Sequence, residues 1–172
     1  EDLRQFTNKD VFLARHPLYD NFGKKLPREE ARKILGLPED KYIYLFFGFI
    51  RTYKGLDLLV DAFHGSPDDS ILLIAGEYYA GEDEIKQQIE HSPVRDRIVA
   101  HTHFINDEEV SLYFSAADCV VQPYRNATQS GVTPLAYHFE VPMIVTNVGA
   151  LPDLVPEQLG VVCEPDTKSL AS

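Results

Sequence analysis

The chain has no tryptophan, only two cysteines and no long apolar run. The absence of any run of about 18 apolar residues excludes a membrane-spanning helix. Cys119 and Cys163 lie in apolar, strand-like runs and lack the spacing of metal ligands. We therefore expect them to be buried free thiols in a protein of a reducing compartment, the cytoplasm.

Positive charge is also scarce. The 172 residues include 16 Lys and Arg against 27 Asp and Glu, which gives a formal net charge of −11. A protein that wraps nucleic acid needs a basic face, so this balance argues against nucleic acid as a partner. It does not exclude a small phosphate ligand, because a few local cations can outweigh the overall field.

Several motifs of catalysis are missing. The sequence contains no phosphate-binding Walker loop, no nucleophile elbow and no Ser-His-Asp order. The dinucleotide fingerprint is absent as well, since Gly48 is followed by the bulky Phe49 and Ile50. His101 and His103 lie two residues apart but have no recognisable third ligand. We therefore predict neither a metal site nor a required cofactor.

Apolar runs alternate with helical patterns along most of the chain. The expected strands are Tyr42–Phe49, Ile71–Gly76, Ile98–Phe104, Cys119–Tyr124, Met143–Val148 and Val161–Cys163. The expected helices are Arg28–Leu35, Leu56–Phe63, Asp83–His91, Asp107–Ala117 and Val132–Phe139. This alternation predicts an α/β fold: a doubly wound, Rossmann-like, mostly parallel sheet of about six strands with helices on both faces.

The two ends of the chain are less regular. We expect residues 1–20 to form a linker or entry segment, in which Val11–Pro17 is a short strand or part of the linker. Residues 21–172 are expected to form one domain. Because the chain begins with Glu1, and Asp166–Ser172 has the pattern of a helix that is cut off, we expect a domain excised from a larger protein.

The first strand leads into a basic turn. Gly48 ends the apolar run, Arg51 and Lys54 follow, and Gly55 opens an amphipathic helix. In an open α/β sheet this turn lies at the carboxyl edge, where ligands bind, and a helix start adds unpaired N–H groups. The sequence therefore predicts a place that holds phosphate.

A second polar segment follows the fourth strand. Thr128, Gln129 and Ser130 can donate hydrogen bonds, and Gly131 allows a ligand to approach the backbone before a helix begins. The shared sheet edge brings this segment opposite Arg51 and Lys54, with room for a diphosphate between them. The alternative at this point is a capped helix with surface cations.

Five motifs together carry a family resemblance. They read GFIRTYKGLDLLVDAF, ILLIAGE, NDEEVSLYFSAADCVVQPY, SGVTPLAYHFEVPMIVTNVGALPDLV and LGVVCEP. In order and spacing the chain resembles, from about His16 to its end, the carboxyl-terminal domain of family-four retaining glycosyltransferases of the GT-B fold. The resemblance implies a nucleotide-sugar donor site here and an absent amino-terminal domain that binds the acceptor.

The resemblance also implies roles for single residues. Lys54 matches the diphosphate-binding lysine of the family. The arginine that usually follows the strand glycine is Phe49 here, and we expect Arg51 to supply that charge instead. Ile105 lies where the family packs an apolar residue near the nucleobase. Two family glutamates, separated by seven residues, are replaced by Ala127 and Leu135.

The sequence thus predicts the donor-binding half of a glycosyltransferase of carbohydrate biosynthesis. A sugar would pass from a UDP-sugar or GDP-sugar to a glycan, a lipid-linked acceptor or a small molecule. Lys54 and Arg51 are the expected catalytic residues, and Gly48, Ile105 and the segment Thr128–Gly131 complete the donor site. This chain alone is expected to be inactive, and membrane association would come only through the missing part.

Two other functions remain open at the level of sequence. One is a nucleotide-sugar epimerase of the same two-domain architecture. The other is a non-catalytic interaction module, for which the replacement of both glutamates by Ala127 and Leu135 argues.

Overall fold

The structure is a computed structural model, and it describes residues 5–10, 12 and 21–172. The expected entry segment Val11–Pro17 lies, apart from Phe12, outside the described residues.

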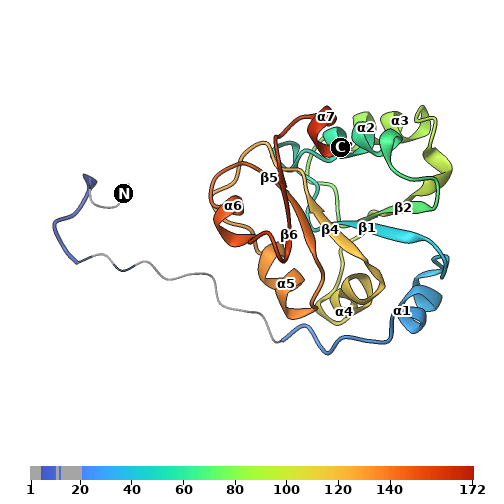
Figure 1. Cartoon of the computed structure of the whole chain (residues 1–172), viewed down its shortest axis with the longest axis horizontal. Coiled ribbons are helices and arrows are strands. Elements are labelled where there is room, and N and C mark those ends of the chain that lie inside the picture. Colours follow the sequence, from blue (N-terminus) through green and yellow to red (C-terminus); the bar gives the residue numbers. More distant parts are fainter. Residues whose placement is uncertain (1–4, 11, 13–20) are drawn as a thin grey trace.

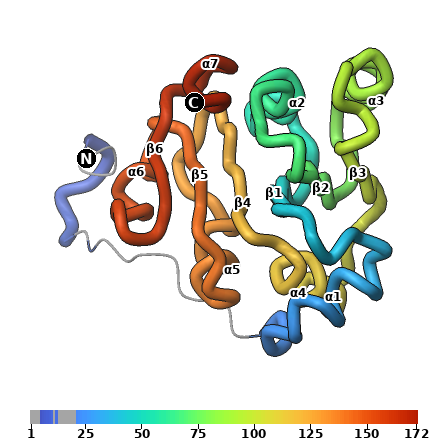
Figure 2. The backbone as a smooth tube through the Cα atoms, turned by 45° about the vertical axis from the view of Figure 1, so that its right-hand side comes forward, coloured from blue at the N-terminus to red at the C-terminus, as the bar shows by residue number. Residues whose placement is uncertain are grey.

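Six parallel strands form one sheet in the order β3-β2-β1-β4-β5-β6 (Figure 2). They are β1 Tyr42–Phe47, β2 Ser70–Ala75, β3 Ile98–His101, β4 Cys119–Gln122, β5 Met143–Thr146 and β6 Gly160–Cys163. Every residue of β2 and β4 is buried, which is why these strands read as continuous apolar runs without alternation.

Helices cover both faces of the sheet (Figure 1). The α-helices are α1 Arg28–Leu35, α2 Leu56–Ala62, α3 Glu82–Glu90, α4 Asp107–Ala116, α5 Val132–His138, α6 Leu151–Leu154 and α7 Thr167–Leu170. Short 3-10 turns are η2 Thr52–Lys54, η3 Phe63–Gly65 and η4 Arg95–Arg97. Helices α1, α4 and α5 lie on one side of the sheet, and α2, α3 and α7 lie on the other (Figure 1).

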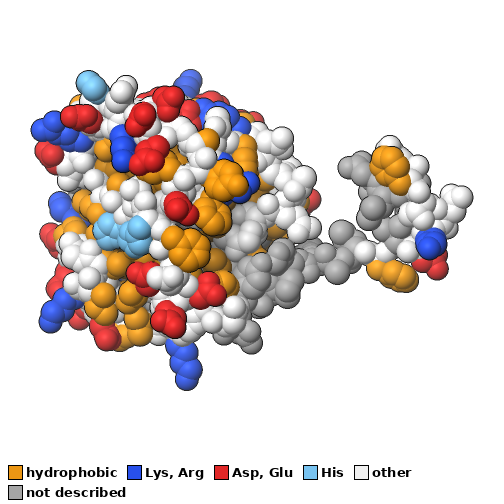
Figure 3. Space-filling view, turned by 180° about the vertical axis from the view of Figure 1, so that it is seen from behind, with side chains coloured by type: hydrophobic (Ala, Val, Ile, Leu, Met, Phe, Trp, Pro, Cys, Tyr) orange, Lys and Arg blue, Asp and Glu red, His pale blue; other side chains and the backbone are white. Residues whose placement is uncertain are grey.

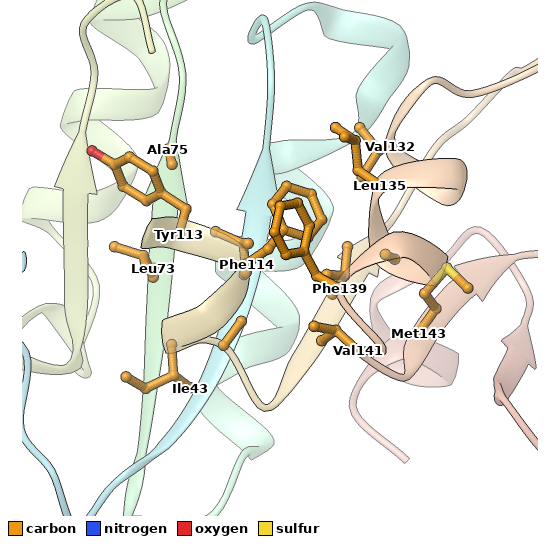
Figure 4. Packing of buried hydrophobic residues seen from close by; sticks show 14 of the residues in the cluster. Ile43, Leu73, Ala75, Tyr113, Phe114, Val132, Leu135, Phe139, Val141 and Met143 are labelled. Carbon is orange, nitrogen blue, oxygen red and sulfur yellow. The ribbon is translucent and has the colours of Figure 1, made fainter. Parts of the chain in front are cut away.

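Each face of the sheet has its own apolar core. On the α4 and α5 side, Phe114 stacks on Phe139 with 5.3 Å between ring centroids (Figure 4). On the α2 side, Phe46 and Val60 belong to the second cluster. The two clusters anchor both helical layers on one sheet, so the loops at its carboxyl edge start from fixed positions.

The strand order reverses between β1 and β4. Strands β2 and β3 continue outward from β1, whereas β5 and β6 continue outward from β4. In doubly wound sheets the loops that leave two such central strands diverge to opposite faces and open a crevice between them. The turn after β1 and the segment after β4 therefore flank this crevice position, where doubly wound sheets bind their ligands.

The predicted fold is confirmed, with small differences at the ends of elements. Strand β1 stops at Phe47 because Gly48 adopts a φ of 95°, a left-handed conformation that turns the chain out of the sheet. Helix α6 and the 3-10 turns were not expected, since segments of three or four residues carry no periodic signal. Cys119 and Cys163 are free, the first buried and the second half-buried. Within the described residues, no helix combines the length and the apolar character needed to cross a bilayer.

Candidate anion-binding site

Lys54 lies at the centre of the candidate site. It ends η2, and its side chain turns back over the end of β1, where a Cβ on Gly48 would be only 3.0 Å from Lys54 Nζ. Only 8% of Lys54 is exposed. A glycine at position 48 therefore leaves the space that the ammonium group occupies.

The charge of Lys54 is not neutralised by the protein. No carboxylate forms an ion pair with it among the residues that the structure describes. Burial, together with the smaller effect of the nearby positive charge of Arg51, lowers the pKa of Lys54 to about 8. A buried cation whose pKa is depressed in this way is stabilised when an anion binds beside it.

The turn that carries Lys54 is fixed to the loop after β4. Gly55 has a φ of 66°, and a Cβ there would overlap the carbonyl oxygen of Pro123. The backbone N–H of Arg125 donates to the carbonyl of Tyr53 at 2.7 Å. Through these two contacts, the backbone of the turn that carries Lys54 packs directly against the backbone of the loop after β4.

A side-chain ion pair adds to this connection. The Arg125 guanidinium donates two hydrogen bonds, of 2.6 and 2.5 Å, to the carboxylate of Asp57 on α2. This bidentate geometry is the strong form of the arginine–carboxylate pair. Arg125 is therefore already neutralised, and the charge available to a ligand comes from Lys54 and Arg51.

Tyr124 links Lys54 to the segment Thr128–Gly131. Lys54 Nζ lies 5.7 Å from the centre of the Tyr124 ring, and the Tyr124 hydroxyl lies 3.4 Å from Ser130 Oγ. Burial raises the pKa of Tyr124 to about 12, so the phenol stays neutral beside the lysine. The structure thus places Lys54 beside Gly48 and connects it to Ser130 through Tyr124.

The start of α5 offers fewer donors than a typical helix start. The N–H of Val132 already donates to Ser130 Oγ at 3.2 Å, and Pro134 has no N–H. Ser130 is buried, whereas Thr128, Gln129 and Gly131 are exposed. Ser130 therefore shapes the loop from inside, and its three neighbours form the accessible surface.

Arg51 directly precedes η2 and has an unusual environment. Its Nε is buried and has no hydrogen-bond partner among the described residues. Its guanidinium carbon lies 4.2 Å from the centre of the Tyr79 ring and 6.0 Å from that of Phe49. Arg51 also lines a hollow of about 420 Å³ between α2 and α3, which includes Asp57 and Glu84.

Other predicted site residues lie farther out or deeper in. Ile105 follows β3, is half-buried and packs against the core beneath α4. Ala127 and Leu135, which the resemblance places at the positions of two family glutamates, are both buried in the same core cluster. Figure 4 shows Leu135 within it. Gly149 lies so close to the carbonyl of Ala127 that a Cβ there would overlap it.

Sequence reasoning assigned no role to Tyr79, Tyr124 or the Asp57–Arg125 pair. Asp57 and Arg125 are 68 positions apart, and nothing in the sequence pairs them. Tyr124 is the last residue of an expected strand, so its place at the carboxyl edge could have marked it. The described residues contain no group of three or more His, Cys, Asp and Glu that could hold a metal ion.

Fold and site together define a doubly wound α/β domain with a buried, unpaired lysine at the reversal of strand order. Residues 27–172 match the family described as glycosyl transferases group 1, and the chain belongs to that family. Its fold is that of the carboxyl-terminal domain of GT-B glycosyltransferases.

Individual relatives agree with this assignment. The chain is 31% identical over 157 residues to the lipopolysaccharide core biosynthesis mannosyltransferase LpsB of Rhizobium meliloti (strain 1021), across 84% of this chain and 43% of that protein. Its fold matches Anabaena HepE in complex with UDP and glucose, with a TM-score of 0.77, 22% identity and coverage of 88% and 42%. It also matches the C-terminal domain of LpcC from Francisella tularensis, with a TM-score of 0.70, 20% identity and coverage of 88% and 82%.

Proposed function

We propose that this chain is the donor-binding part of a retaining glycosyltransferase that uses a nucleoside-diphosphate sugar in the cytoplasm. The family supports transfer of a sugar, and HepE, which shares the fold, is a protein seen with UDP and glucose. The two free thiols, Cys119 and Cys163, support a reducing compartment. The acceptor would be a glycan, a lipid-linked sugar or a small molecule.

One observation carries the proposal: the buried, unpaired ammonium of Lys54 at the reversal of strand order. A diphosphate placed over Gly48 would pair with this charge and lie between the η2 turn and the segment Thr128–Gly131. Arg51 adds a second cation at the same wall. Ile105 would form the apolar side of the base site.

These cations would also assist the chemistry. When the glycosidic bond of the donor breaks, negative charge builds on the leaving diphosphate. Lys54 and Arg51 are fixed beside this position before the reaction, so they stabilise the developing charge more than the ground state. The proposal requires no metal ion, because two cationic side chains supply the charge. Acceptor activation lies in a second domain, so this chain alone binds donor and turns over nothing.

Ala127 and Leu135 favour a second candidate function. Both positions are apolar and buried, so neither can offer a carboxylate to a ribose or to a sugar ring. A non-catalytic interaction module would tolerate this loss and would bind no nucleotide. An epimerase of the same architecture would bind the nucleotide but act without an acceptor, which an assay of the full-length protein with and without acceptors would reveal.

The deciding experiment is a thermal-shift and calorimetric panel of UDP, GDP and ADP on this chain. We expect one nucleotide to bind, and the identity of that nucleotide names the base of the donor. Lys54→Ala is expected to weaken binding about tenfold or more, because a charge-assisted contact to the diphosphate is lost.

Lys33→Ala is the matched control. Lys33 is an exposed lysine on α1, an element that belongs to neither the η2 turn nor the segment after β4. Its loss should leave the affinity unchanged. If none of the three nucleotides binds, the interaction module becomes the better function. Equal affinity of Lys54→Ala and the parent would refute the assignment of the site.

A further inference from the structure

Tyr79 is an exposed aromatic residue without a structural reason for its position. It follows β2 by four residues, and 69% of its surface is accessible. It contributes to neither of the two core clusters. Its ring makes contact with only two described side chains, Arg51 and Phe49.

The backbone fixes Tyr79 beside the η2 turn. Beyond the ends of β1 and β2, Ile50 and Tyr78 form an isolated parallel bridge. The N–H of Ile50 donates to the carbonyl of Glu77 at 2.8 Å, and the N–H of Tyr79 donates to the carbonyl of Ile50 at 2.9 Å. Tyr79 is therefore held in register with the residue that precedes Arg51.

The rings form a chain of contacts that ends on the guanidinium. Phe104 contacts Phe49 with 6.4 Å between centroids, and Phe49 contacts Tyr79 edge-on at 6.2 Å and 71°. Arg51 Cζ lies 4.2 Å from the centre of Tyr79, within the range of a cation–π contact. Exposed hydrophobic side chains also gather beside a pair of histidines on the face seen in Figure 3.

Arg51 needs such support, because polar groups do not hold it. It forms no ion pair with a described residue, and its Nε is buried without a hydrogen-bond partner. A long cationic side chain without polar partners samples many rotamers in solution. The face of Tyr79 restricts the guanidinium without using its hydrogen-bond donors, which stay available for an anion.

We propose that Tyr79 is a positioning residue that acts through Arg51. This inference rests on the proposed function, since it assigns Arg51 to the diphosphate. The Tyr79 ring holds the guanidinium of Arg51 toward the crevice. Phe49, which stands in place of the family arginine, contacts the Tyr79 ring edge-on and restricts its orientation. Tyr79 itself does not contact the ligand.

The first test needs no ligand. The side-chain NMR signals of Arg51 in this chain should be shifted upfield by the Tyr79 ring. Tyr79→Phe should keep this shift and Tyr79→Ala should remove it. Tyr42→Ala, which removes another exposed tyrosine at the start of β1, should leave it unchanged. If the parent shows no ring-current shift, the inference is wrong whatever the chain binds.

The second test is a double-mutant cycle on the affinity for whichever nucleoside diphosphate binds in the panel. Tyr79→Ala is expected to weaken binding roughly threefold to tenfold, and Tyr79→Phe to stay within about twofold of the parent. In an Arg51→Ala background the Tyr79→Ala change should have no further effect, because its target is gone.

Additive losses, or a Tyr79→Phe variant as weak as Tyr79→Ala, would overturn the positioning role. Additive losses would mean that Tyr79 touches the ligand directly. If Lys54→Ala weakens binding but the cycle is additive, only the inference about Tyr79 fails. If Lys54→Ala binds as tightly as the parent, the proposed function itself fails.

Discussion

Two buried cations lie at opposite edges of the sheet, and the protein treats them differently. Arg32 on α1 is 2% exposed, and Lys54 at the end of η2 is 8% exposed. The Arg32 guanidinium donates to the Asp118 carboxylate at 2.5 Å. It also donates to the backbone carbonyls of Ala116, Glu39 and Lys41. Lys54 has neither a carboxylate nor a carbonyl partner among the described residues.

The difference separates a structural charge from a functional one. Asp118 directly precedes β4, and it also accepts the N–H of Ile43, so Arg32 and Asp118 close the amino edge of the sheet. A buried charge that is fully paired needs nothing from outside the protein. The unpaired charge of Lys54 lowers the stability of the free chain, and a bound anion would supply the missing partner.

Breaking the amino-edge pair should give the largest effect. Asp118→Ala leaves the buried charge of Arg32 without its carboxylate and removes the acceptor of the Ile43 N–H. We expect a loss of about 3–5 kcal/mol in the free energy of unfolding, measured by urea denaturation.

Asp57→Ala is the control for this change, since it breaks the half-exposed pair with Arg125 at the other edge. It should cost at most about 1 kcal/mol. Similar losses for the two variants would show that burial does not distinguish these ion pairs.

Two glycines sharpen the comparison, because one follows each cation in the chain. Gly36 closes the helix that carries Arg32, with a φ of 68° and nothing within 4 Å of a Cβ. Gly55 follows Lys54 with nearly the same φ, 66°, but lies against Pro123. We expect Gly36→Ala to cost about 1–2 kcal/mol, from the left-handed conformation alone.

Gly55→Ala should cost about 2–4 kcal/mol, because the new methyl group also overlaps a backbone carbonyl that cannot move freely. Thermal unfolding of the two variants under the same conditions measures the difference. Gly55→Ala should also weaken nucleotide binding, since the η2 turn must shift to make room for the methyl group. Equal losses in stability would mean that the loop after β4 is less fixed than the Arg125 and Pro123 contacts indicate.

The sequence predicted the sheet, and from it a place for the candidate site, because both rest on short-range patterns. Apolar runs such as the one from Tyr42 to Phe47 mark buried parallel strands, and the carboxyl ends of such strands meet at one edge. Lys54 and Ser130 were singled out as candidates in this way. The same reasoning placed a helix start after Gly131, and α5 does begin at Val132.

The remaining parts of the site depend on contacts between distant residues. The Asp57–Arg125 pair, the close approach of Gly55 to Pro123 and the stacking of Arg51 on Tyr79 each join residues from different loops. No periodicity or propensity encodes them. The state of Lys54 belongs to the same class, because its missing carboxylate is a property of the assembled crevice rather than of its sequence neighbours.

The pH dependence of binding tests the unpaired state of Lys54 and carries the smallest expected effect. The pKa of Lys54 is about 8 in the free chain, below the ordinary lysine value of 10.5. The cationic form that pairs with a diphosphate is therefore present below pH 8 and is lost as the pH rises through it. The affinity for the nucleotide should fall about tenfold between pH 7 and pH 9, a range in which phosphate groups are already mostly ionised.

Lys54→Arg provides the control, since a guanidinium stays charged over this range and should give a flat profile. The stability of the free chain should show the opposite sign. Between pH 8 and 10.5 the unfolded chain binds the Lys54 proton and the folded chain does not, so the parent should gain stability relative to Lys54→Met as the pH rises. A flat binding profile for the parent would mean that Lys54 keeps an ordinary pKa and has a partner that neutralises it, and the contrast with Arg32 would then disappear.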